Sequence, residues 1–252
     1  MTRSVEPRTL PSRAHRPVTT TVFFDVDFTL IHPGPTFNGE GYQRFAARHK
    51  VDVSSGRFAT AVAAASVELD HAQDDIYRPD IFVSYARRVL EEMGGVGSGL
   101  LPCAEEIYDE WALCQHFALY DDVQPALERL HRAGFRIGLI SNTHRCLTSF
   151  QSHFELAEFI TAALSSSDHG YMKPHPSIFE AALKLVGATP EESVMVGDSL
   201  GHDIHGARQI GMRGVLLARS DAADVKTQVD VPVIRTLGEL PHALEKMEVL
   251  SP

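Results

Sequence analysis

Five short runs along the chain are continuously hydrophobic rather than alternating between apolar and polar positions. They are TVFF at 21–24, FRIGLI at 135–140, FITAAL at 159–164, SVMVG at 193–197 and GVLLA at 214–218. Continuous hydrophobicity is typical of strands that are covered on both faces of a parallel sheet. The runs therefore predict the strands of a sheet that lies between two layers of helices.

Helical patterns separate the last four runs. The pattern over residues 122–133 is followed by Gly134, a residue type that often ends helices. Residues 175–187 carry Pro176 in the first turn and finish at Gly187, which is the usual asymmetry of helix ends. Strands that alternate with helices of this length predict right-handed βαβ units, and hence a doubly wound, Rossmann-like α/β fold.

The region from 34 to 120 breaks this alternation, because its pattern is mostly helical. Its helical stretches are YQRFAARHK, RFATAVAAASVELDHA, DIFVSYARRVLEEMGG and AEEIYDEWALCQHF, with Gly and Pro residues between them. We therefore predict a Rossmann-like core formed by residues 19–33 and 121–252, with a helical cap inserted over residues 34–120. Residues 1–18 are rich in Pro and Arg and are expected to form a flexible tail.

Composition narrows the possible partners. The formal net charge of −10 argues against nucleic acid or an anionic membrane as the main partner, although a local positive pocket could still bind small anions. No apolar run is long enough to span a bilayer, and the first residues contain no apolar signal segment. The three cysteines show no CxxC spacing, which fits a reducing compartment. We expect a cytoplasmic protein, and its oligomeric state stays open.

Polar residues follow the predicted strands at the points where the strands end. In an open parallel sheet, ligands bind outside these carboxyl ends. The polar residues are Asp25, Asp27 and Thr29 after the first run, Ser141 and Asn142 after the second, Lys173 in the loop after the third, and Asp198 and Asp203 after the fourth. They are expected to converge at one edge of the sheet.

These residue types are suited to phosphoryl transfer. Asp25 and Asp27 are two residues apart, so an extended backbone would direct both side chains the same way. With Asp198 they form a cluster of hard oxygen ligands that suits Mg²⁺. Lys173 adds a second compensating charge. A cation, an ammonium group, hydroxyl and amide donors and a carboxylate nucleophile are the components that phosphoryl transfer requires.

The four motifs resemble those of the haloacid dehalogenase-like hydrolases. FFDVDFTL, LISN, the KP at 173–174 and VGDSLGHDIHGA follow in the order of that family, and the match extends over nearly the whole chain from Val18. The most similar subgroup carries a helical cap between its first and second motifs, where the insert lies here. The resemblance therefore implies the same fold and an enzyme that hydrolyses a small phosphorylated metabolite.

The resemblance also implies roles for individual residues. Asp25 is expected to be the nucleophile that forms an aspartyl-phosphate, and Asp27 the general acid and then the base. The substrate-binding residues are expected to be Thr29, Ser141 and Asn142, with Lys173 stabilising both the nucleophile and the phosphate. Mg²⁺ is expected to be held by Asp25, the backbone carbonyl of Asp27 and Asp198, with Asp203 supporting from nearby.

One position departs from the family pattern. Phe28 stands between Asp27 and Thr29, where the family usually has glycine, and it is expected to narrow the entrance or to pack against the cap. Asp27 itself favours a phosphatase over a dehalogenase, because an alkoxide leaving group needs a proton and a halide does not. A phosphomutase and a catalytically idle scaffold remain alternatives.

Several residues allow more than one interpretation. Ser141 could cap the following helix instead of binding phosphate. His144 and Arg145 could contact substrate or lie in a solvated first helical turn. The pair His202 and His205 lacks a third ligand at a spacing that suits zinc. The aromatic residues of the predicted cap, Trp111 among them, are expected more often in the core than at a substrate site.

Overall fold

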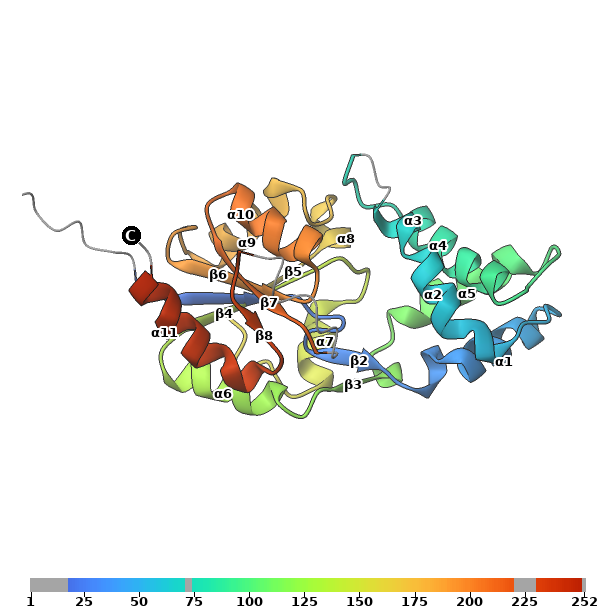
Figure 1. The fold of residues 1–252 in the computed structure, drawn as a ribbon, viewed down its shortest axis with the longest axis horizontal. Helices are drawn as coiled ribbons and strands as arrows, with labels where there is room; N and C mark the ends of the chain where they lie inside the picture. Colours follow the sequence, from blue (N-terminus) through green and yellow to red (C-terminus); the bar gives the residue numbers. More distant parts are fainter. Residues whose placement is uncertain (1–17, 71–73, 220–229, 251–252) are drawn as a thin grey trace, which may run out of the picture.

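A six-stranded parallel sheet forms the centre of the protein (Figure 1). The computed structural model describes residues 18–70, 74–219 and 230–250, so nearly all of the predicted tail lies outside the described residues. The strands, in their order across the sheet, are β5 (Ala162–Ser165), β4 (Arg136–Ser141), β1 (Thr21–Phe24), β6 (Ser193–Gly197), β7 (Arg213–Leu217) and β8 (Val233–Ile234). Every neighbouring pair is parallel. The predicted doubly wound fold is confirmed.

Helices cover both faces of this sheet (Figure 1). One face carries α6 (Val123–Arg132), α7 (Leu147–His153) and α11 (Leu240–Leu250), and the other carries α9 (Pro176–Val186) and α10 (Gly206–Gln209), with the short α8 (Ser166–His169) following β5. The central strand β1 serves both layers. Val22 and Phe24 pack on the first face, and Phe23 packs on the second. This two-sided burial explains why the run is continuously hydrophobic.

Two boundaries differ from the sequence prediction. The run predicted as a strand over residues 159–164 becomes strand only at Ala162. Phe159 instead closes a turn, because its N–H donates to the carbonyl of Leu156 at 3.0 Å. The helix predicted over residues 57–72 is divided at Ser66, whose hydroxyl donates to the carbonyl of Ala63 at 2.9 Å and competes with the regular helix pattern.

A group of helices lies at one end of the sheet, between β1 and β4 in the chain (Figure 1). We call residues 34–120 the helical insert. Its helices are α1 (Gly39–Arg48), α2 (Phe58–Ala65), α3 (Val67–Asp70), α4 (Pro79–Glu92) and α5 (Leu100–Trp111). The chain leaves and returns through an antiparallel pair, β2 (Ile31–Pro33) and β3 (Phe117–Leu119). The insert is thus connected to the sheet by two adjacent backbone segments.

The carboxyl end of β1 faces this insert. Asp25 directly follows β1 and continues its pairing, since its N–H donates to the carbonyl of Val196 in β6 at 2.9 Å. The polar residues at this edge of the sheet therefore lie between the sheet and the insert. Among the described residues, no helix is both long and apolar enough to cross a membrane.

Candidate active site

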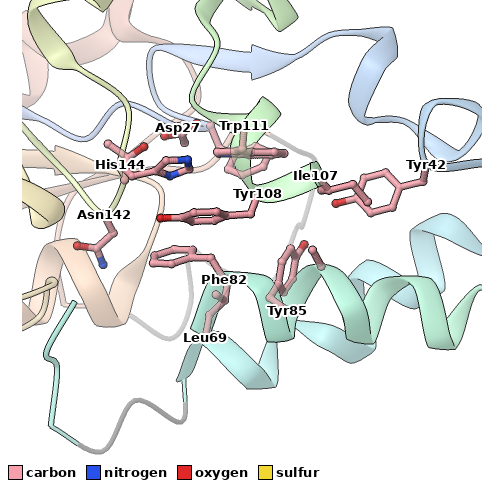
Figure 2. A pocket seen from close by; sticks show the side chains of 13 residues that line it. Asp27, Tyr42, Leu69, Phe82, Tyr85, Ile107, Tyr108, Trp111, Asn142 and His144 are labelled. Atoms are coloured by element: carbon pink, nitrogen blue, oxygen red, sulfur yellow. The ribbon is translucent and has the colours of Figure 1, made fainter. Parts of the chain in front are cut away.

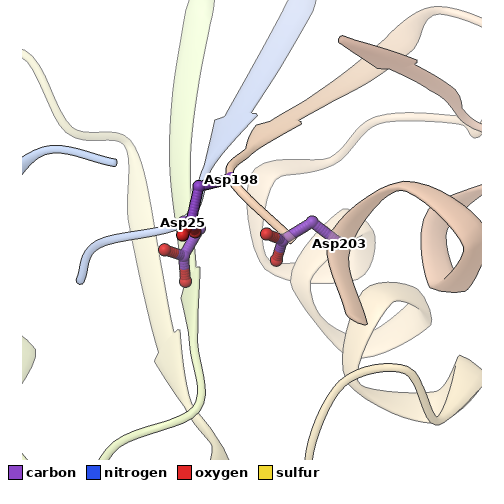
Figure 3. Close-up of side chains that lie close together, drawn as sticks. All are labelled: Asp25, Asp198 and Asp203. Carbon is purple, nitrogen blue, oxygen red and sulfur yellow. The ribbon is translucent and has the colours of Figure 1, made fainter. Parts of the chain in front are cut away.

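Three carboxylates from two strand ends meet at the edge of the sheet. Asp25 follows β1, Asp198 follows β6, and Asp203 lies in the π-helical turn Leu200–His205 (Figure 3). Carboxylate oxygens of the three residues lie within 4.8 Å of one another. Asp25 and Asp203 are buried, and Asp198 is exposed at the rim. The predicted convergence of these three residues is observed, although they are far apart in the chain.

Lys173 compensates the two buried carboxylates. Its Nζ donates to Oδ1 of Asp25 and to Oδ1 of Asp203, both at 2.6 Å, and to the carbonyl of Ile140 at 2.8 Å. The lysine is itself buried, with 3% of its surface exposed. All three ammonium protons therefore have acceptors. The side chain acts as a buried counter-charge within this part of the structure.

The carboxylates repel one another even with this lysine present. Burial raises the pKa of Asp25 well above its usual value, and the nearby Asp203 and Asp198 add to the shift while Lys173 opposes it. Asp198 is exposed at the rim, yet neighbouring groups withdraw its carboxylate from part of the water, and this partial desolvation together with the nearby Asp203 raises its pKa to about 6. For Lys173, burial disfavours the ammonium form, but the carboxylates of Asp203 and Asp25 outweigh it and raise its pKa. The site thus has an excess of negative charge that a further cation would relieve.

The residues after β4 occupy different positions in this site. Ser141 is 1% exposed, and its hydroxyl has no hydrogen-bond partner among the described residues. It does not cap the next helix, because Cys146 occupies that position. Asn142 binds the backbone of Lys173 twice: its Oδ1 accepts from the N–H at 2.7 Å, and its Nδ2 donates to the carbonyl at 2.9 Å. Asn142 therefore positions the lysine loop, and Ser141 leaves a buried hydroxyl available.

Thr29 and Asp203 each contact another residue of the site. Thr29 is buried, and its hydroxyl lies 3.5 Å from Oδ1 of Asp198. Asp203 accepts from the N–H of Ser199 at 3.0 Å through Oδ2, while Oδ1 accepts from Lys173. Gly197 makes room for it, since a Cβ there would lie 2.2 Å from Asp203 Oδ2. Both oxygens of Asp203 are thus engaged, which suits a supporting position better than direct metal ligation.

Asp27 lies apart from the carboxylate cluster. Its side chain forms an ion pair with Arg145, in which Nη1 donates to Oδ1 at 3.2 Å and Oδ2 at 3.0 Å and Nη2 donates to Oδ1 at 3.2 Å. The Asp27 side chain is 17% exposed and the Arg145 side chain 0%. The sequence grouped the Asp27 carboxylate with those of Asp25 and Asp198. In the structure Asp203 takes that place in the cluster, because Arg145 holds the Asp27 side chain.

Arg145 also connects the core to the helical insert. Its Nη2 donates to the carbonyl of Trp111 at the end of α5 at 2.8 Å, and its guanidinium lies over the ring of Phe117 at 4.4 Å from the centroid. Of the two interpretations offered by the sequence, a solvated first helical turn is wrong for Arg145. No local pattern indicates the pairing, because Asp27 is 118 positions away in the sequence.

We expect Arg145→Lys to destabilise the protein by about 1–3 kcal/mol, because an ammonium group cannot replace a bidentate, ring-stacked guanidinium. Urea denaturation measures this free energy of unfolding. The matched control is Arg132→Lys, since Arg132 pairs with Glu128 in a geometry that leaves its side chain 73% exposed. The control is expected to change the free energy of unfolding by no more than about 0.5 kcal/mol. Equal effects of the two substitutions would contradict the importance of the buried pair.

Phe28 occupies a backbone conformation that favours glycine. Its φ is 63°, in the left-handed region, which costs a residue with a Cβ roughly 1–2 kcal/mol. Its side chain is 46% exposed, and the ring centroid lies 6.5 Å from that of Trp111 in α5. Of the two sequence expectations for Phe28, contact with the insert is therefore observed. The strain is retained at a position beside Asp27, a placement typical of functional sites.

Comparison with known families and proteins gives consistent results. A family model described as haloacid dehalogenase-like hydrolase matches residues 19–211. The human haloacid dehalogenase-like hydrolase domain-containing protein 3 is 30% identical over 150 residues, which cover 60% of each chain. The glyceraldehyde 3-phosphate phosphatase of Pyrococcus furiosus is 34% identical over 124 residues, 48% of this chain and 51% of the relative. The matches to these two relatives thus span only about half to three fifths of their length.

Solved structures show the same fold. A 2-haloacid dehalogenase from Pseudomonas syringae aligns over 91% of this chain and 100% of its own, with a TM-score of 0.61 and 25% identity. The magnesium-bound putative hydrolase YfnB of Bacillus subtilis aligns over 90% and 99%, with a TM-score of 0.68 and 19% identity. At 19% identity, the similarity to YfnB shows a shared fold and nothing about activity.

Proposed function

The chain belongs to the haloacid dehalogenase-like hydrolase family, and on that basis we propose that it is a Mg²⁺-dependent phosphatase of a small phosphomonoester, acting through an aspartyl-phosphate. The observation that carries this proposal is the different pairing of two neighbouring acids. Asp25 is buried against Lys173, and Asp27 is held by Arg145 at the edge of a cavity. This pairing supports Asp25 as the nucleophile and Asp27 as the acid that protonates the leaving group.

The proposed reaction has two steps. In the first, an oxygen of Asp25 attacks phosphorus, the bond from phosphorus to the ester oxygen breaks, and Asp27 donates a proton to that oxygen. In the second, Asp27 takes a proton from water, which attacks phosphorus and releases phosphate from Asp25. Lys173 stabilises the negative charge beside the reacting carboxylate, and the unpaired hydroxyl of Ser141 is available to a phosphate oxygen.

The carboxylate cluster fits a magnesium ion. Oxygens of Asp25, Asp198 and Asp203 approach within 4.8 Å, and hard oxygen ligands with excess negative charge are what Mg²⁺ requires. In the proposal, Asp25, Asp198 and the backbone carbonyl of Asp27 hold the ion, and Asp203 orients Lys173 and the loop around it. When bound, the ion would neutralise charge on the transferring phosphoryl group.

The helical insert is proposed to act as a cap that covers the site and excludes water. Several relatives are described as phosphatases, among them the glyceraldehyde 3-phosphate phosphatase of Pyrococcus furiosus and a phosphoserine phosphatase of Thermus thermophilus. These descriptions support a small phosphorylated metabolite as the substrate. We also propose that the protein is located in the cytoplasm.

Dehalogenation is the second candidate, because the Pseudomonas syringae neighbour is a dehalogenase. Asp27 argues against it here, because a departing halide needs no proton and a dehalogenase has no use for a second acid at this position. A phosphomutase would use the same residues but transfer the phosphoryl group to another hydroxyl instead of to water.

The test is a free-phosphate assay over a panel of phosphomonoesters. We expect release of inorganic phosphate in the presence of Mg²⁺, loss of activity in EDTA, and recovery when Mg²⁺ is restored. Chloride release from 2-chloropropionate, measured in parallel, would favour the dehalogenase. Turnover without free phosphate would favour the phosphomutase, and turnover that is indifferent to the chelator would contradict the metal.

A further inference from the structure

A cavity lined mainly by aromatic side chains opens beside Asp27 (Figure 2). Its aromatic walls come from the first motif and from helices α4 and α5 of the insert, with one residue from α1. These aromatic residues are Phe28, Tyr42, Phe82, Tyr85, Tyr108 and Trp111. Tyr42 belongs to the hydrophobic core, and Tyr85 and Trp111 pack against it, as the sequence predicts for aromatic residues of this region. Each also contributes to the wall of a space that adjoins the proposed general acid.

The size of the cavity limits what it can hold. Its volume is about 160 Å³. A cavity of roughly 150 Å³ with apolar walls is known to accommodate benzene. The space therefore matches one six-membered ring, and it is too small for a nucleobase together with its ribose. Tyr108 lies between His144 and Phe82 in the wall, with ring centroids 3.9 Å and 6.3 Å apart, so flat groups already stack at this place (Figure 2).

The charged residues around the cavity disfavour substrates that carry a second acidic group. Among the described residues in its wall, Asp27 carries the only carboxylate, and no lysine or arginine is present. Arg145 lies behind Asp27 with a fully buried side chain and is occupied by that carboxylate. His144 adds no positive charge, because burial and the neighbouring Arg145 lower its pKa. A second phosphate or a carboxylate on the substrate would meet no cation in the cavity and would be repelled by Asp27.

The aromatic cavity adjoins the carboxylate site through Asp27, which lies in its wall. It also shares Asn142, Phe82 and Leu69 with a second cavity of about 300 Å³ that Lys173 helps to line. A monoester whose phosphorus lies at Asp25 could therefore extend its alcohol portion past Asp27 and among the aromatic rings. We propose that the aromatic cavity selects phosphomonoesters whose leaving group is an uncharged, single-ring aromatic alcohol. This inference rests on the proposed phosphatase function and specifies its substrate class.

The first test compares kcat/KM for benzyl phosphate and for 2-phosphoglycolate in the full-length protein with Mg²⁺. Since a single methylene in a hydrophobic pocket already changes specificity by about 10–200-fold, benzyl phosphate is expected to be preferred at least about tenfold. Phe28→Gly is expected to reduce this preference about tenfold by raising KM for benzyl phosphate. Glycine suits the left-handed backbone at this position, so the variant should fold with an unchanged or higher Tm.

The matched control is Leu185→Ala, which also shortens an exposed apolar side chain. Leu185 is 57% exposed on α9 and does not line the cavity. The substrate preference of this variant should stay within about twofold of the wild type, as for surface substitutions away from a site. An equal or greater kcat/KM for 2-phosphoglycolate, or a preference that Phe28→Gly leaves unchanged, would overturn the inference.

A binding measurement separates this inference from the proposed function. Trp111 is the single tryptophan of the chain and lines the cavity, so its fluorescence reports occupancy. Benzylphosphonate is expected to bind at least about tenfold more tightly than phosphonoacetate, and Phe28→Gly should remove the difference. If no ester is hydrolysed, the phosphatase proposal fails while this binding preference still supports the cavity inference. Equal dissociation constants for the two phosphonates would overturn the inference even in an active enzyme.

Discussion

Asp25→Asn is expected to lower phosphate release at least about a thousandfold, because the amide oxygen is a poor nucleophile and the attacking carboxylate has no substitute. The fold should persist. Asparagine has nearly the same shape, and Lys173 keeps Asp203 and the carbonyl of Ile140 as acceptors. Because burial raises the pKa of Asp25, its ionised form is unfavourable in the folded protein, so the Tm of the metal-free variant should be no lower than that of the wild type.

The measurement combines a free-phosphate assay with a thermal unfolding curve in EDTA. The matched control is Asp52→Asn, which makes the same chemical change at an exposed position of the insert. This control should retain its activity. Retention of more than a few per cent of activity by Asp25→Asn would rule out Asp25 as the nucleophile, whereas loss of activity with a collapsed Tm would show a structural role instead.

Lys173→Met is expected to destabilise the metal-free protein by about 3–5 kcal/mol, since removal of one partner from a buried ion pair leaves uncompensated charge. Methionine replaces the alkyl part of the lysine but cannot donate to Asp25, Asp203 or Ile140. The Lys173→Met variant should also lose its activity. Urea denaturation in EDTA measures the free energy of unfolding.

Two further variants test whether Lys173→Met lowers the free energy of unfolding through the loss of charge. Lys184→Met makes the same change at an exposed position on α9 and should alter the free energy of unfolding by no more than about 0.5 kcal/mol. In the double variant Lys173→Met with Asp203→Asn, one repelling carboxylate is also removed. The double variant should therefore be more stable than the sum of the single effects predicts, by about 1 kcal/mol or more. Strict additivity would show that the lysine contributes by packing rather than by charge.

The sequence was most informative where the structure depends on residues that are close together in the chain. The continuous hydrophobicity of residues 21–24 and 193–197 predicted strands that are buried on both faces, and both strands have those bounds. Gly187 was predicted to end a helix and does so with a φ of 71°. The two-residue strand β8 carries too short a pattern to be recognised, because its pairing with β7 depends on the sheet already being present.

Within the site, the sequence indicated which residues come together but not how they are paired. Asp25, Asp198, Asp203 and Lys173 could be grouped because each follows a strand of one parallel sheet. The pairing of Arg145 with Asp27 could not be predicted, because the two residues are 118 positions apart and their side chains meet only in the folded protein. The same holds for Asn142, since no local pattern indicates that its side chain holds the backbone of Lys173.

By itself, the sequence determined the layered fold, the family and the edge of the sheet where the polar residues converge. Hydrophobic patterns, helix-ending residues and the order of the motifs can all be read along the chain. Only the tertiary structure decided which cation compensates which acid, left the hydroxyl of Ser141 without a partner, and turned aromatic residues of the insert toward a cavity beside Asp27. The physical reason is that burial and pairing are set by groups that meet only after the chain has folded. An aromatic side chain has the same appearance in a sequence whether it fills a core or lines a cavity.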